Sequence, residues 1–176
     1  MAFMLSPGVS RIVTIVLRVL AAIVLFVSLV MLVANNQDYP DPSDNGNTKT
    51  ARFYDQVGFQ YMAATTALGI GFSIYGTVVV ALRIKRGNDE GNLLIDFYGQ
   101  KVLSNLLVTG AVAGFLTVQA VEKALSDYVG DTFAVLVTNN YYWGMYKTCS
   151  GLVLLGFFLS VALSILSSHT LVRRNY

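Results

Sequence analysis

Four long apolar stretches alternate with shorter polar segments along the chain. They cover residues Ile12–Ala34, Val57–Leu82, Val102–Val121 and Thr148–Leu171. An α-helix rises 1.5 Å per residue, so about 20 apolar residues cross a hydrocarbon core about 30 Å thick. Each stretch reaches that length. The sequence therefore predicts an all-α membrane protein, a bundle of four transmembrane helices that forms a single domain over residues 1–176.

The composition fits a chain whose main solvent is lipid. Hydrophobic residues make up 55% of it and charged residues 12%, about half the share that is usual in a soluble domain. The net charge is only +2, and no basic patch is interleaved with aromatic residues, so a nucleic-acid partner is not expected. The expected partners are membrane lipids and either further copies of the chain or a partner membrane protein.

The basic residues predict the orientation of the bundle. Seven lie before the first helix, in the middle loop 83–101 or after the fourth helix, whereas four lie in the loops 35–56 and 122–147. The first group is Arg11, Arg83, Lys85, Arg86, Lys101, Arg173 and Arg174, and the second is Lys49, Arg52, Lys123 and Lys147. The positive-inside rule then predicts that both termini and the middle loop are cytosolic and that the other two loops are outside.

The two outer loops differ in composition. Residues 35–56 carry Pro40, Pro42, Gly46 and several Asn and Asp, which favours turns or irregular chain. Residues 122–147 are rich in aromatic side chains, among them Tyr141, Tyr142 and Trp143. Such a cluster is typical of an aromatic belt at the headgroup level, or of an exposed surface on which a partner docks. Both interpretations stay open.

Arg18 is a charged residue about two turns inside the first helix. A charge at this depth costs a few kcal/mol or more unless it is paired or reaches the interface. The acid nearest in depth is Asp96, at the cytosolic start of the third helix. We therefore expect a contact between Arg18 and Asp96 within a small intramembrane polar cluster.

Small residues recur on three of the predicted helices. Gly110 and Gly114 form a GxxxG spacing in the third helix, and Gly69, Gly71 and Gly76 lie in the second. The fourth carries small residues four apart: Gly156, Ser160, Ser164 and Ser168. Small side chains let helix backbones approach closely in a membrane. These positions predict contacts within the bundle or contacts between copies or with a partner protein.

The inventory of reactive side chains does not indicate an enzyme. One histidine, His169, and one cysteine, Cys149, do not make a zinc site of the usual type. The acids Asp38, Asp41 and Asp44 lack the EF-hand pattern. No catalytic residue, cofactor or metal is therefore expected.

All four predicted helices contain segments that are found together in one family. The third helix contributes Ile95–Phe115 and the first Leu17–Ala22. The second contributes Phe59–Met62 and Ser73–Tyr75, and the fourth Cys149–Gly151 and Leu163–Ser168. In this combination the segments resemble plant Casparian-strip membrane domain proteins and their CASP-like relatives. This family is related to the MARVEL four-helix proteins, so the resemblance implies the same fold.

The resemblance also bears on the polar cluster. The family has an Arg in the first helix, which Arg18 matches, and an Asp in the third. At the position of that Asp this chain has Gln100, in the run Phe97-Tyr98-Gly99-Gln100-Lys101. Arg18 could donate a charge-assisted hydrogen bond to the Gln100 carbonyl, and Asp96, one turn earlier, could supply the missing charge.

Three functions remain in competition. The resemblance implies a plasma-membrane scaffold, because founding members form immobile platforms there and recruit cell-wall-modifying enzymes. The second is an accessory subunit of a larger membrane transporter, channel or enzyme complex. The third is a small-solute conduit lined by hydroxyl groups, from Thr65, Thr66, Ser73, Thr77, Thr109 and Thr117.

Overall fold

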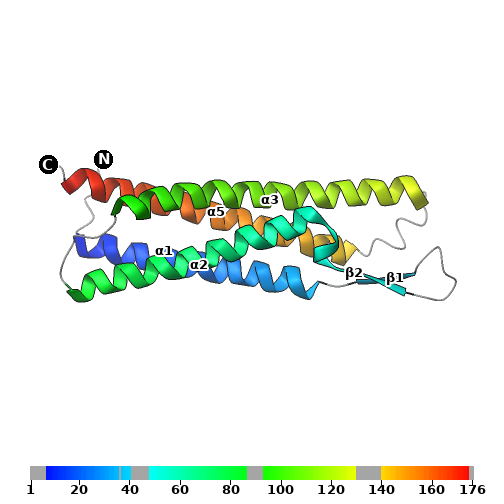
Figure 1. Ribbon diagram of the computed structural model, residues 1–176, viewed down its shortest axis with the longest axis horizontal. Coiled ribbons are helices and arrows are strands. Elements are labelled where there is room, and N and C mark those ends of the chain that lie inside the picture. The colour runs from blue at the N-terminus through cyan, green and yellow to red at the C-terminus, as the bar shows by residue number, and fades with distance from the viewer. Residues whose placement is uncertain (1–6, 36, 41–47, 87–92, 130–139, 175–176) are drawn as a thin grey trace.

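Four long helices lie side by side in the structure, a computed structural model that describes residues 7–35, 37–40, 48–86, 93–129 and 140–174 (Figure 1). The helices are α1 Pro7–Ala34, α2 Val57–Arg86, α3 Leu93–Val129 and α5 Asn140–Arg174. Helix α1 packs against α2 and α5, and α3 packs against the same two helices. Helices α1 and α3 are therefore diagonal neighbours across the bundle.

Each helix buries one stripe and exposes the rest. On α1 the buried residues recur every three or four positions, as in Arg18, Ala21, Leu25, Ser28 and Leu32. Between them lie exposed apolar side chains such as Ile23 and Phe26. This spacing places the buried residues on one helix face. The exposed apolar positions need lipid, or another protein, as their surroundings.

All four helices are long and apolar enough to cross a membrane, which confirms the predicted four-helix membrane fold. The candidate spans are Ile12–Ala34, Val57–Leu82, Asp96–Lys123 and Trp143–Ser168. The first two coincide with the predicted stretches, whereas the third and fourth begin earlier. Hydrophobicity alone missed the first residues of these two spans because they include polar side chains. Asp96 and Gln100 are buried in the bundle, and Lys147 pairs with Glu122 at 2.7 Å. Their polarity therefore does not end the spans.

The ends of the bundle differ. Helix α1 begins and α5 ends at the same end, and a β-hairpin made by strands β1 and β2 (residues 37–40 and 48–51) lies at the opposite end (Figure 1). This is the arrangement that four consecutive crossings produce. That the first of these ends faces the cytosol stays a prediction.

The segment between α1 and α2 is more regular than its composition indicates. Strands β1 Gln37–Pro40 and β2 Thr48–Ala51 pair antiparallel, with Gln37 opposite Ala51. A 3-10 turn, η1 Phe53–Asp55, then leads into α2. The predicted outer loop 122–147 also contains helix, because α3 continues to Val129 and α5 begins at Asn140.

Candidate functional site: a buried ion pair among closely packed helices

Arg18 and Asp96 form an ion pair inside the bundle. Arg18 belongs to the buried stripe of α1, and Asp96 lies in the first turn of α3, where the helix dipole favours a negative charge. Nη2 of Arg18 lies 2.6 Å from both carboxylate oxygens of Asp96. The Arg18 side chain is 0% exposed and that of Asp96 10%. A pair so removed from water is strongly attractive, and removal of either partner leaves an uncompensated buried charge.

The polar cluster is only partly satisfied by its own members. Among the described residues, Nε and Nη1 of Arg18 and Oε1 of Gln100 are buried without a hydrogen-bond partner. Gln100 lies one turn after Asp96 on α3 and is 1% exposed. The structure thus brings Arg18 to Asp96, and it buries Gln100 one turn further along α3. No described hydrogen bond joins Arg18 to the Gln100 carbonyl.

Gly76 on α2 makes room for the Arg18 side chain. A Cβ atom at Gly76 would overlap Nη1 of Arg18. Since α1 and α3 are diagonal, the arginine has to cross the bundle interior past α2 to reach Asp96. The sequence indicates Gly76 only as one small residue among several on its helix. Its contact with Arg18 depends on the rotation of α2, which composition does not reveal.

The predicted GxxxG pair of α3 packs helices of one chain together. A Cβ at Gly110 would overlap Thr65 of α2, and at Gly114 it would lie 2.5 Å from Sδ of Met62 and from Oγ of Ser150. This geometry places the GxxxG face of α3 inside the bundle rather than on its outer surface.

The small residues of α5 divide between interior and surface. A Cβ at Gly156 would lie 2.6 Å from Cδ2 of Leu25 on α1. Ser160 is buried, but Ser164 is only half-buried and borders a surface groove. A helix has 3.6 residues per turn, so a series spaced four apart drifts off the buried face.

Aromatic contacts close the hairpin end of the bundle. Tyr146 of α5 stacks on Phe59 of α2, with ring centroids 4.2 Å apart. Its hydroxyl donates to the backbone carbonyl of Asn35, just past α1, at 3.0 Å. Trp143 is half-buried, with its ring centroid 6.3 Å from that of Tyr146. Tyr141 lies with Tyr142 in the first turn of α5, and their side chains lie outside the described part.

Several of the hydroxyl groups considered as a conduit lining are bonded within their own helices. Thr65 and Thr66 both donate to the carbonyl of Met62, at 3.0 and 2.7 Å. Thr77 donates to Ser73 and Thr117 to Ala113. Side chains bonded in this way are turned toward backbone rather than toward a pathway.

The family of the chain follows from a comparison with known proteins. The Casparian strip membrane protein domain matches residues 7–130, which contain α1, α2, α3 and therefore both partners of the ion pair. The chain belongs to this family. The matched residues of the Casparian strip membrane protein domain end before α5, but similar plant proteins extend the likeness through it.

Those relatives carry CASP-like names of the 4D subgroup. CASP-like protein 4D1 of Ricinus communis is 32% identical over 169 residues, covering 94% of each chain. The 4D1 protein of Populus trichocarpa is 33% identical over 171 residues, covering 94% of this chain and 90% of its own. CASP-like protein 4D2 of Arabidopsis thaliana is 28% identical over 178 residues, covering 96% and 95%. No solved structure matches the chain.

Proposed function

We propose that the protein is a non-enzymatic scaffold of the plasma membrane, which self-associates and organises or recruits partner proteins in a membrane domain. Membership of the Casparian strip family supports this role, as does the location of most of the described chain in four apolar helices. The buried charges also support it, because the Arg18–Asp96 pair joins α1 to α3 and so has a structural use within the bundle.

The observation that carries the proposal is the difference between inward and outward glycines. At Gly110, Gly114 and Gly156 neighbouring helices of the same chain occupy the space of a Cβ atom. At Gly71, Gly144 and Gly151 no other helix of the described part of the chain comes within 4 Å of that position. In a membrane, helices associate by close packing at small residues rather than by a hydrophobic driving force. The outward glycines are therefore suited to contacts between chains.

The surface around Gly71 has the shape that such a contact needs. A groove of about 690 Å³ runs along the outer side of α2, lined by Ala64, Ala67, Leu68, Gly71, Phe72 and Tyr75. Three of its lining residues are small, and the large side chains of Leu68 and Tyr75 are exposed beside them. We assign it to a helix of a second copy, which brings apolar side chains of the same kind.

Partner recruitment would use the hairpin end. Trp143 stands there with Tyr141 and Tyr142 in the first turn of α5. Tyr and Trp supply much of the binding energy at protein interfaces. Because Trp143 packs against Tyr146, a partner would meet an anchored aromatic ring rather than a loose loop.

The test is the mass and composition of the complex after mild extraction into lipid nanodiscs. We expect particles whose protein mass is two or more whole multiples of 19.2 kDa, the mass of one chain. The Gly71→Leu variant should shift them toward the single chain, because its side chain fills the groove. Val112→Leu adds bulk to an exposed position on α3 and should leave the mass unchanged. A fixed ratio with a different protein would instead identify an accessory subunit, and unchanged Gly71→Leu assemblies would exclude this groove as the contact.

A further inference from the structure

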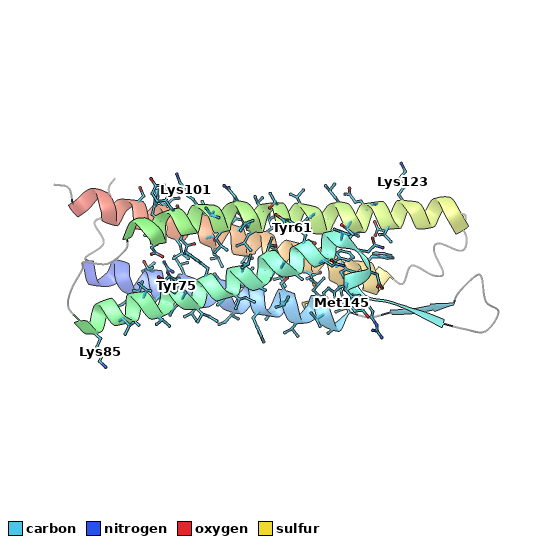
Figure 2. The ribbon with its side chains drawn as sticks, in the orientation of Figure 1. Tyr61, Tyr75, Lys85, Lys101, Lys123 and Met145 are labelled. Atoms are coloured by element: carbon cyan, nitrogen blue, oxygen red, sulfur yellow. The ribbon has the colours of Figure 1, made fainter. Side chains whose placement is uncertain are left out.

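A second surface groove lies between α3 and α5, separate from the groove on α2. It encloses about 420 Å³ and is lined by Lys101, Ser104, Asn105, Phe157, Val161, Ser164 and Ile165. Lys101 places it toward the end of the bundle at which α1 begins (Figure 2). Unlike the α2 groove, it combines a cation, polar groups and an apolar wall.

Lys101 supplies the cation at the rim of this groove. Its side chain is exposed, and Nζ lies 5.0 Å from the ring centroid of Phe97. Phe97 is one turn closer to the start of α3, so the ammonium group is directed toward the near membrane surface, as a snorkelling lysine is. Among the described residues no carboxylate pairs with Lys101. An anion from outside the chain could therefore occupy this position.

Asn105 places a polar group deeper in the membrane. It lies four residues after Lys101, about 6 Å further along the helix axis, and is exposed. Its backbone carbonyl accepts the hydroxyl of Thr109 at 3.0 Å, but in the described part of the chain its side-chain amide has no partner. An amide left unpaired toward hydrocarbon is costly. A ligand with a hydrogen-bonding group at this depth would remove that cost.

Helix α5 supplies the apolar wall. Ile165, Val161 and Phe157 follow one another at intervals of four residues, over about 12 Å of helix. Because α5 runs back toward the end at which α1 begins, Ile165 is nearest that end and Phe157 is deepest (Figure 1). From the surface inward, α3 thus offers a cation and then an amide, and the apolar wall of α5 runs alongside them and continues to Phe157.

We propose that the α3–α5 groove binds one anionic phospholipid. Its phosphate would lie at Nζ of Lys101, its glycerol ester carbonyl would accept from the Asn105 amide, and one acyl chain would lie along Val161 and Phe157. This sequence of groups matches a phospholipid from its phosphate inward. The exposed faces of the described helices are mainly apolar, so a helix of a second copy matches the cation and the amide of this groove less well than a phospholipid does.

The test is native mass spectrometry of the full chain released from nanodiscs of equal phosphatidylglycerol and phosphatidylcholine. We expect one phosphatidylglycerol to stay bound to the wild type. Lys101→Gln should lower its retention about tenfold, the effect of one charge-assisted contact. Lys85→Gln is the matched control, since Lys85 is an exposed lysine of α2 at the same end (Figure 2). This control should change retention less than twofold.

A second variant tests the wall independently of the charge. Ile165→Trp leaves Lys101 in place but fills the groove from α5, and it should lower retention to a similar degree. Equal losses from the two lysine variants would overturn the proposal, because they would indicate general attraction to surface charge. Equal retention of the two lipids would overturn it, as would a dimer that depends on Lys101 while lipid binding does not.

Discussion

Arg18 contacts both α2 and α3 in the interior of the bundle, at Gly76 and at Asp96. Its guanidinium group is fully buried and meets the Asp96 carboxylate through a single nitrogen, Nη2. Nε and Nη1 are left without a hydrogen-bond partner among the described residues. The stabilisation of this charge therefore depends on one carboxylate, and Gln100 does not share it.

The residue-scale prediction is that Asp96→Asn destabilises the bundle. The change keeps the shape of the side chain but leaves Arg18 buried without a counter-charge, which costs about 3–5 kcal/mol. Thermal unfolding in nanodiscs would show a lower midpoint. Glu122→Gln is the matched control: its partner Lys147 is 48% exposed, so the loss should be at most about 1 kcal/mol. Equal midpoints for Asp96→Asn and the wild type would show that the pair contributes no net stability.

At the scale of the helices, the diagonal relation of α1 and α3 gives α2 an unexpected role. Helix α2 lies between the helices that carry the two charges, and it lets the arginine pass because position 76 has no side chain. The fit of α2 against α1 is thus set by a charged group as well as by apolar packing.

The element-scale prediction compares two glycines of α2. Breaking the buried pair by displacing the guanidinium costs about 3–5 kcal/mol, and alanine regains about 1 kcal/mol of helix propensity. Gly76→Ala should therefore destabilise the protein by about 2–4 kcal/mol. In the single chain, Gly71→Ala should be neutral or stabilise by up to about 1 kcal/mol, since no other described helix occupies that space and alanine favours helix. Thermal unfolding of the two variants side by side separates the effects. Equal behaviour would mean that Arg18 moves aside without cost.

The sequence was sufficient for part of this arrangement. Run length predicted the first two spans, and depth in the membrane predicted that Arg18 would meet Asp96. The starts of α3 and α5 could not be predicted in this way, because Asp96 is charged and yet buried. The partners of Gly76 and Gly110 depend on helix rotation. Hydrophobicity fixes that rotation only loosely when lipid and protein interior are both apolar.

At the scale of the whole molecule, the two ends of the bundle differ in their basic residues. The end at which α1 begins carries Lys85 and Lys101, and the hairpin end carries Lys123 (Figure 2). The distribution of basic residues over the full sequence favours a cytosolic position for the first end.

The molecule-scale prediction concerns labelling by a membrane-impermeant maleimide. A cysteine in place of Thr48, on β2, should react in intact cells, whereas one in place of Lys85 should react only after permeabilisation. The native Cys149 is buried, so the wild type serves as the unlabelled control. The reverse pattern would show that the termini face outward.

The sequence separation of the ion pair has a consequence for the synthesis and membrane insertion of the protein. Arg18 and Asp96 are 78 residues apart, and a ribosome adds about 5–20 residues per second. The first helix therefore waits about 4 to 16 s, on that rate, before its counter-charge is made. During this interval the newly inserted helices α1 and α2 contain an arginine without a counter-charge. Its side chain can only extend to the membrane surface near the start of α1. A chain without Asp96 gains no counter-charge when α3 is made, so quality control of nascent membrane proteins would meet the defect already during synthesis.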